Sequence, residues 1–316
     1  MAACLFCLAT LPAQAQTYPA KPITIVVAYP AGGDTDAMAR LFAEKLSTRL
    51  GQPVVIDNRP GASGVIGSSF VAKAPADGYT LLLAPSTFSI AQLVLKTGSG
   101  SGYDVLNGFT PIVQTGVQPL FLVAGSGVAA KSTKQLVESA KSDQSLSYAS
   151  PGSGSPMHIL GEMFNKAAGV NIRHVPYKGV APAVNDVLGG HLPLTYITYG
   201  PVAPHVQNGK MSLLGVASSA RTPLAPNVPT LQEQGYKGVE VTAWNGLFGP
   251  KGLPPEIVKT LNSHFNDILK MPDVAAKMAV LGALPAGGAP EALAKTNAAD
   301  FERFGRVIKE LGIQAD

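Results

Sequence analysis

Charge is scarce in this chain of 316 residues, because only 14% of its residues are Asp, Glu, Lys or Arg. The net charge of +4 is mild and the basic residues are scattered, so the sequence lacks the basic patch of a nucleic-acid-binding surface. Hydrophobic residues make up 46%, which excludes a disordered chain and allows one large domain or two medium ones. We therefore expect a folded protein with no nucleic-acid partner.

Cysteine is nearly absent, and both cysteines, Cys4 and Cys7, fall in an uncharged apolar stretch at the N-terminus. The stretch ends in Ala13-Gln14-Ala15, the small-residue pattern of a secretory cleavage site. Residues 1–16 are therefore predicted to be a signal peptide cleaved near Ala15. Its usual basic start is missing, which leaves open whether the true start codon lies upstream. A mature chain without cysteine favours the bacterial periplasm over a eukaryotic secretory route.

Common catalytic and metal-binding motifs are missing as well. The chain contains no GxSxG, no HExxH and no GxxxxGK[ST] sequence. Its five histidines do not have the spacing of metal ligands; they are His158, His174, His191, His205 and His264. The sequence therefore predicts neither an enzyme nor a cofactor.

Two glycine-rich loops stand out among the residues that are present. Residues 29–36 read Tyr-Pro-Ala-Gly-Gly-Asp-Thr-Asp and follow the apolar run 23–28. Residues 150–158 read Ser-Pro-Gly-Ser-Gly-Ser-Pro-Met-His and follow the run 146–149. Each loop precedes a helical pattern, and a helix start presents free N–H groups with partial positive charge. Two such loops predict a cleft that holds an anion from both sides.

Strand and helix patterns alternate along the chain, which indicates an α/β fold with parallel strands. The helix at 36–50 is predicted to have Asp34 or Thr35 as its N-cap. Strands are predicted at residues 23–28, 54–56, 79–84, 146–149, 172–175, 192–199, 213–217 and 239–248. Helices are predicted at residues 36–50, 64–74, 133–140, 158–168, 182–188, 254–270 and 290–311.

Two segments look like crossings between domains. The apolar stretch 109–124 would leave a first domain, and the strand at 239–248 would lead back into it. This is the plan of a hinged binding protein. We expect lobe 1 to comprise residues 17–118 plus 243–316, and lobe 2 to comprise residues 119–242.

Nearly the whole mature chain resembles the substrate-binding proteins of tripartite tricarboxylate transporters, also called the Bug family. The order and spacing of short segments carry this resemblance. These segments are residues 18–23, 29–40, 53–62, 76–81, 109–112, 175–179, 186–190, 228–230 and 244–247.

The resemblance implies a type II periplasmic binding protein fold, with two α/β lobes joined by two crossover strands and a ligand cleft between them. It further implies a carboxylate ligand held by backbone amides and ordered water from two loops, and membrane permease subunits as partners. Those two loops match the glycine-rich segments. We expect the receptor itself to be a monomer.

Ligand contacts are predicted at the two loops and at the carboxyl ends of strands, where ligands bind in parallel α/β folds. Asp36 is also expected to order its loop by accepting N–H groups. Tyr29 could contact the ligand or fill the core, and His158 could contact the ligand or make a structural hydrogen bond. The predicted residues are Tyr29, Ala31, Gly32, Gly33, Asp36, Ser86, Thr87, Gly152, Ser153, Gly154, Ser155, His158, Thr198 and Tyr199.

One segment departs from the family pattern. The family usually carries Asp where Pro193 stands and a polar or acidic residue near Ile197. Losing an acid at the cleft would remove a partner for an amino group. We therefore interpret the ligand as a less polar carboxylate than an amino acid, aromatic carboxylates included.

Other conspicuous residues are expected to have structural or solvated positions. Arg40, Arg59 and Lys178 could pair with a ligand, but ordinary surface or structural roles are favoured, and Trp244 is expected in the core. The sequence as a whole predicts a periplasmic receptor that captures a small organic carboxylate by hinge closure and delivers it to a permease. A sensory module that signals to a membrane receptor is the alternative.

Overall fold

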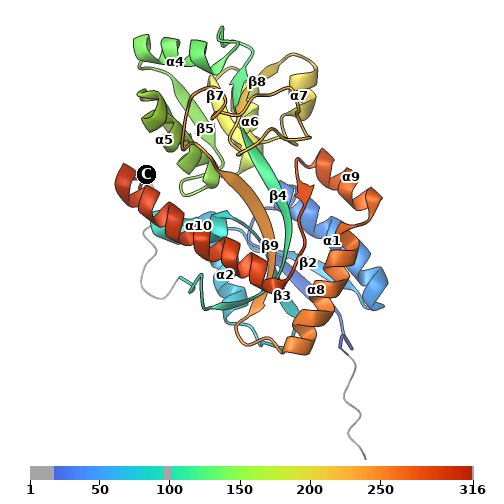
Figure 1. Cartoon of the computed structure of the whole chain (residues 1–316). Helices are drawn as coiled ribbons and strands as arrows, with labels where there is room; N and C mark the ends of the chain where they lie inside the picture. Colours follow the sequence, from blue (N-terminus) through green and yellow to red (C-terminus); the bar gives the residue numbers. More distant parts are fainter. Residues whose placement is uncertain (1–17, 96–101, 315–316) are drawn as a thin grey trace, which may run out of the picture.

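Strands and helices alternate along the chain (Figure 1), and the computed structural model describes residues 18–95 and 102–314. The predicted signal peptide lies outside these residues. The strands are β1 (Ile23–Val27), β2 (Val54–Asn58), β3 (Thr80–Pro85), β4 (Phe109–Gly125), β5 (Ser147–Ser150), β6 (Arg173–Pro176), β7 (Leu194–Thr198), β8 (Met211–Val216), β9 (Thr242–Pro250) and β10 (Leu284–Pro285). The helices are α1 (Asp34–Leu50), α2 (Val65–Ala72), α3 (Thr87–Val94), α4 (Thr133–Ser142), α5 (Pro156–Ala168), α6 (Val180–Leu188), α7 (Ala203–Gln207), α8 (Pro255–Leu269), α9 (Pro272–Val280) and α10 (Pro290–Leu311), with a short 3-10 turn at Ala62–Gly64.

One lobe is built on β1, which pairs in parallel with β2 on one side and β3 on the other. The sequence of β1, Ile-Thr-Ile-Val-Val, is rich in β-branched residues and almost wholly buried, as expected for a strand covered on both faces. Beyond β3 the sheet continues through β9 and β4 in antiparallel pairing. The predicted parallel α/β rhythm at the N-terminus is confirmed.

The long strand β4 passes from this lobe into the other one. Residues 109–119 pair with β9, whereas residues 120–125 pair with β7 and β8. In the second lobe β5 pairs in parallel with both β6 and β7. Figure 1 shows β4 and β9 side by side along the middle of the molecule. The two-lobed binding-protein fold is confirmed, and the exact lobe boundaries stay a prediction.

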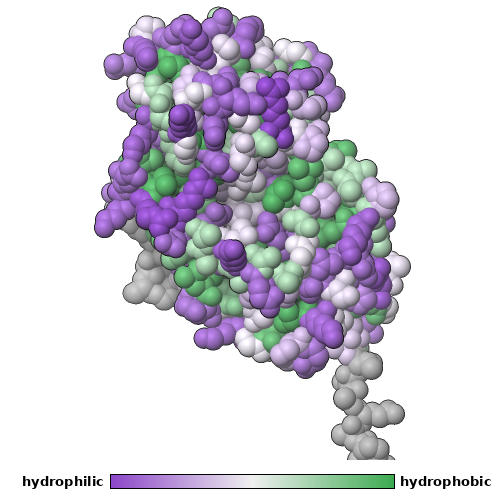
Figure 2. All heavy atoms as spheres, in the orientation of Figure 1, coloured by the Kyte–Doolittle hydropathy of each residue, from purple (hydrophilic) through white to green (hydrophobic). Residues whose placement is uncertain are grey.

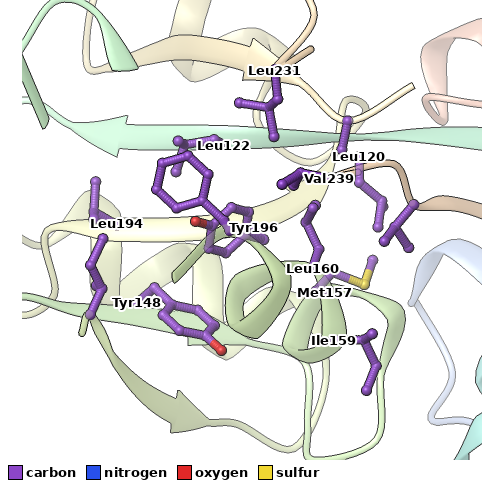
Figure 3. Packing of buried hydrophobic residues seen from close by; sticks show 14 of the residues in the cluster. Leu120, Leu122, Tyr148, Met157, Ile159, Leu160, Leu194, Tyr196, Leu231 and Val239 are labelled. Atoms are coloured by element: carbon purple, nitrogen blue, oxygen red, sulfur yellow. The ribbon is translucent and has the colours of Figure 1, made fainter. Parts of the chain in front are cut away.

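The second lobe has its core on the face of the sheet that α5 covers. Tyr148 and Tyr196 are fully buried there among apolar residues of β4 and α5. Figure 3 shows Tyr196 between Leu122 and Leu160, with Tyr148 alongside. Burying a side chain of this size stabilises the fold by roughly 1.5–3 kcal/mol. This core fixes where α5, and therefore the loop before it, begins.

Helix α10 ties the two lobes together. Its N-terminal Leu293 packs in a core cluster with residues of β3 and β9, whereas Phe304 and Ile308 pack in the core of the second lobe. Figure 1 shows α10 lying across both lobes. A helix of 22 residues spans roughly 33 Å. The prediction of a helix at 290–311 is confirmed with the same bounds.

Several local predictions are wrong in instructive ways. Helix α1 starts two residues earlier than predicted and its N-cap is Gly33, so neither Asp34 nor Thr35 is the cap. Helices α3, α7 and α9 are not predicted at all. Because α3 is buried on several sides, it has no polar stripe from which a helical period could be recognised. Within the described residues, no helix is long and apolar enough to cross a membrane.

Candidate ligand-binding cleft

The predicted ligand residues come together where the two lobes meet. The loops after β1 and β5 lead into α1 and α5, and the end of β3 leads directly into α3. Three contacts join the lobes here, and they also involve the end of β7 and the 3-10 turn after β2. The Thr198 hydroxyl donates to Asp34 Oδ2 at 3.0 Å, Ser63 Oγ donates to the Ser153 carbonyl at 3.4 Å, and Gly154 packs on α3.

The first loop is organised by the buried carboxylate of Asp36. It accepts hydrogen bonds from the Gly32 N–H at 2.9 Å, Arg40 Nε at 2.9 Å and Asn58 Nδ2 at 3.0 Å. Burial alone would raise the pKa of Asp36, but the bonds from Arg40, Gly32 and Asn58 lower it overall. The expectation that Asp36 orders this loop is confirmed. One consequence is that the Gly32 N–H is already used within the loop.

The start of α1 remains available to a ligand. Gly33 is the N-cap, and no side chain of the described residues caps the helix. The N–H groups of residues 34–36 therefore lack the usual capping oxygen, at the end of the helix that carries partial positive charge. Such a helix start can hold a carboxylate without a cationic side chain.

Tyr29, Ser86 and Thr87 have protein partners at the same edge. The Tyr29 hydroxyl donates to the Ser63 carbonyl at 3.0 Å and also hydrogen bonds Thr87, while burial raises its pKa. Ser86 Oγ accepts from the Trp244 N–H at 3.3 Å. Trp244 is 2% exposed and donates from its indole nitrogen to Asp300, so its predicted core position is confirmed.

The second loop is organised by His158, which lies in the first turn of α5. Its Nδ1 accepts the Gly154 N–H at 3.3 Å, and Ser155 caps the helix by accepting the His158 N–H at 3.2 Å. The His158 ring stacks on His174 at 3.8 Å between ring centroids. His158 therefore makes structural hydrogen bonds, its contact with a ligand stays a prediction, and His174 is a neighbour that the sequence analysis missed.

The two lobes contact each other closely at the cleft. A Cβ on Gly154, whose φ is +77°, would lie 3.2 Å from the Cβ of Val94. On another part of the interface, a Cβ on Gly282 would lie 2.4 Å from the Gly200 backbone nitrogen. Figure 2 shows a waist between the lobes, with hydrophobic side chains gathered beside it over α9.

Pro193, one basis for expecting a less polar or aromatic ligand, lies away from the cleft. Pro193 precedes β7 and its carbonyl accepts the Gly125 N–H, so it lies at the end of β7 opposite Thr198. Ile197 is buried in an apolar cluster. The Pro193 and Ile197 side chains therefore give no support for a missing acid at the cleft, and the preference for a less polar or aromatic carboxylate stays a prediction. Asp34 places an acid there instead, and burial raises its pKa while the Thr198 hydroxyl partly offsets that effect.

The remaining predicted residues occupy ordinary positions near the loops. Arg40 pairs with Asp36, as described above, and Arg59 pairs with Asp57 at 2.6 Å and lies over the Phe70 ring. Tyr199 packs on Phe121 with 5.7 Å between ring centroids. Ala31, beside Gly32, and Lys178 are both exposed. The Gly152 N–H donates to Ser150 Oγ at 3.2 Å.

Two buried amides on the crossover strands are further candidates that the sequence analysis missed. Asn245 Nδ2 donates to Gln118 Oε1 at 2.7 Å. Gln118 Nε2 and Asn245 Oδ1 have no partner among the described residues. Asn245 is paired with Pro85, so it lies beside the start of α3. No local motif marks this pair, because its members are 127 positions apart in the sequence.

Comparison with known proteins identifies the family. A family model described as "Tripartite tricarboxylate transporter family receptor" matches residues 38–313. The chain belongs to this receptor family. It is 38% identical over 302 residues to the protein BugT of Bordetella pertussis, covering 95% of this chain and 92% of BugT. The resemblance found in the sequence is thereby confirmed, and the family is one of substrate-binding receptors rather than enzymes.

Solved structures of similar proteins support the same conclusion. The periplasmic binding protein BugD is 35% identical with a TM-score of 0.85, covering 95% of this chain and 100% of BugD. Rpa4515 of R. palustris, solved with adipate, is 35% identical with a TM-score of 0.87 and coverages of 94% and 99%. MatC from Rhodopseudomonas palustris, solved with malate, is 30% identical with a TM-score of 0.82 and coverages of 92% and 100%.

The described part of the receptor contains no group of three or more His, Cys, Asp or Glu side chains that could hold a metal ion. The arrangement at the cleft is suited to binding through backbone N–H groups, hydroxyls and amides. Whether each predicted residue contacts the ligand stays a prediction.

Proposed function

We propose that this receptor works in the periplasm, where it captures a small organic carboxylate between its two lobes and delivers it to the permease of a tripartite tricarboxylate transporter. The carrying observation is the uncapped start of α1, which faces the other lobe at the Asp34–Thr198 contact. The predicted signal peptide and the family support the location and the partner. The receptor would act as a monomer.

Capture would follow from closure of the lobes about the crossover strands β4 and β9. A carboxylate at the start of α1 reaches the second lobe only when the loop at 150–155 and the end of β7 are close by. A ligand that contacts both lobes favours the closed state by its difference in affinity for the two states. The Asp34–Thr198 hydrogen bond contributes to the same state.

The ligand class follows from the neighbours and from the cleft. Rpa4515 and MatC were solved with adipate and malate, which are both aliphatic dicarboxylates. A dicarboxylate can offer one carboxylate to α1 and the other to the loop at 150–155. Because the aromatic preference has lost its basis at Pro193, aliphatic dicarboxylates are the first candidates.

The test is a thermal-shift and calorimetric screen of the chain from residue 17 onward, after unfolding and refolding to remove any ligand carried from the host. The panel is adipate, malate, citrate, glutamate, benzoate and phthalate. A ligand at 100 times its Kd stabilises the folded state by about 2.7 kcal/mol, which is a clear shift in melting temperature. We expect a dicarboxylate to give the largest shift. A panel without any shift after refolding would contradict the proposal.

A further inference from the structure

Two imidazoles are stacked behind the loop at 150–155 in the second lobe, one buried and one half-buried. His158 comes from α5 and is 5% exposed, and His174 comes from β6. Their ring centroids are 3.8 Å apart and the ring planes differ by 10°. His158 is a predicted ligand contact, but neither that prediction nor the family assignment gives the stacked pair a role.

Each imidazole is hydrogen bonded to the loop by a different route. His158 Nδ1 accepts the Gly154 N–H at 3.3 Å. His174 Nε2 shares a hydrogen bond of 2.6 Å with Ser150 Oγ, which also accepts the Gly152 N–H at 3.2 Å. A ring nitrogen that accepts a hydrogen bond carries no proton. His158 therefore has its proton on Nε2 and is neutral in this arrangement.

Tyr148 and, beyond it, Glu162 are neighbours of the pair. The Tyr148 ring lies 5.1 Å from the His174 ring, and the Tyr148 hydroxyl donates to Glu162 Oε1 at 2.7 Å. Burial raises the pKa of Glu162, which reduces its tendency to supply a compensating negative charge. Burial, with His158 as a second contribution, lowers the pKa of His174 to about 3.

We propose that the stacked, neutral imidazoles of His158 and His174 are positioning residues that hold the loop at 150–155 in its shape, and that acidification releases this loop. A proton on His158 Nδ1 would turn the acceptor of the Gly154 N–H into a donor. A proton on His174 would put a buried charge against the other ring. The consequence for ligand affinity rests on the proposed function, whereas the release of the loop does not.

The direction of the pH effect follows from the His174 pKa. It is lower in the folded protein than its ordinary value of 6.5. The stabilising contribution is therefore complete above pH 6.5 and is lost as the pH falls toward 3. The loop would consequently loosen on the acid side of neutrality.

The test is NMR on the ligand-free receptor, so it does not depend on finding the ligand. With 15N-labelled histidine, we expect His158 as the neutral Nε2–H tautomer at pH 7 and His174 still neutral at pH 5. During acidification, the Gly152 and Gly154 amide signals should titrate together with the two rings. The Gly32 and Gly33 amides, which lack a histidine partner, should not follow them.

Variants separate positioning from simple packing. His158→Gln keeps an oxygen that can accept the Gly154 N–H but cannot be protonated, so the Gly154 signal should stay near its wild-type position and lose its response to pH. In His158→Leu, the Gly154 amide signal should also shift from its wild-type position at pH 7. His191→Gln, at an exposed site, should leave the Gly154 signal and its response to pH unchanged. The proposal is overturned if His158 is protonated on Nδ1 at pH 7. It is also overturned if both rings titrate while Gly152 and Gly154 remain unmoved.

Discussion

The two loops at the cleft are held in the same way by residues of opposite character. In each loop a glycine N–H donates to the side chain four positions later, in the first turn of the following helix. In the first loop the pair is Gly32 and Asp36, and in the second it is Gly154 and His158. Both loops thus give up one N–H for their own rigidity and can present the neighbouring ones to a ligand.

The difference between the loops lies in charge. Asp36 is a carboxylate with a lowered pKa that is supported by Arg40 and Asn58, whereas His158 is a neutral ring supported by a second imidazole. An anion between them meets N–H groups on both sides rather than a positive side chain. In each loop, therefore, one glycine N–H keeps the loop rigid, while neighbouring N–H groups can bind the ligand.

The largest effect should come from breaking the first loop. Asp36→Ala removes a buried carboxylate that accepts from the Gly32 N–H, Arg40 Nε and Asn58 Nδ2. Of these three donors, only Asn58 Nδ2 keeps another acceptor among the described residues, the Tyr29 carbonyl. We expect the free energy of unfolding to fall by about 3 kcal/mol, measured by urea denaturation. The control is Asp57→Ala, which removes a half-exposed ion pair with Arg59 and should cost less than about 1 kcal/mol. Equal losses in the two variants would refute the role of Asp36.

For the second loop, we expect the main effect in the pH dependence of the free energy of unfolding. Since the pKa of His174 falls from 6.5 to about 3 on folding, lowering the pH from 7 to 5 should reduce the free energy of unfolding by about 2 kcal/mol. His174→Phe keeps a stacking ring without a titratable group and should remove most of this dependence. Parallel pH profiles for the wild type and the variant would show that the pair is not the source.

Contact between the lobes can also be tested at a place that involves neither glycine-rich loop. Gly282→Ala adds a Cβ at 2.4 Å from the Gly200 nitrogen and at a φ of +75°, so the lobes cannot approach as closely. We expect ligand affinity to fall about tenfold, which corresponds to about 1.4 kcal/mol. Gly312→Ala has a similar φ of +65° with open space around it, and it should leave affinity unchanged. Calorimetry with the ligand found in the screen measures both variants.

A smaller effect is expected from the Thr198 hydroxyl, which reaches from the second lobe to Asp34 in the first. Thr198→Val keeps the shape but removes the donor to Asp34, which should weaken binding about fivefold, or about 1 kcal/mol. Thr110→Val removes a hydroxyl that donates to the Pro250 carbonyl at 2.9 Å. Both residues lie where β4 begins and β9 ends, at the end of this strand pair remote from the second lobe. The variant should lower stability without changing affinity. Similar losses of affinity in the two variants would mean that Thr198 acts only on stability.

Much of this architecture can be predicted from sequence, because local pattern determines it. The strand at β1 and the helix at 290–311 are clear from apolar periodicity, and both loops are visible as glycine between a strand and a helix. The Gly–x–x–x–Asp and Gly–x–x–x–His spacings are also local. For the residues that end these two spacings, the sequence predicted that Asp36 orders its loop, whereas a structural role for His158 was one of two alternatives.

The contacts across the cleft could not be predicted, because they depend on how distant segments fold together. Thr198 and Asp34 are 164 positions apart. The same holds for the amide pair Gln118 and Asn245, whose members show no motif. The ligand argument from Pro193 failed for this reason, since position along a strand decides which end faces the cleft.

The most direct test of the central claim is calorimetric titration of a dicarboxylate from the screen into wild type and Gly33→Leu. Gly33 has an ordinary φ of −82°, and only the Pro30 carbonyl, at 3.6 Å, lies near the position of its Cβ, so the variant should fold. Its side chain would cover the start of α1. The account predicts at least a hundredfold loss of affinity for Gly33→Leu and none for Gly127→Leu, at an exposed position with open space. Wild-type affinity in a folded Gly33→Leu receptor would contradict it.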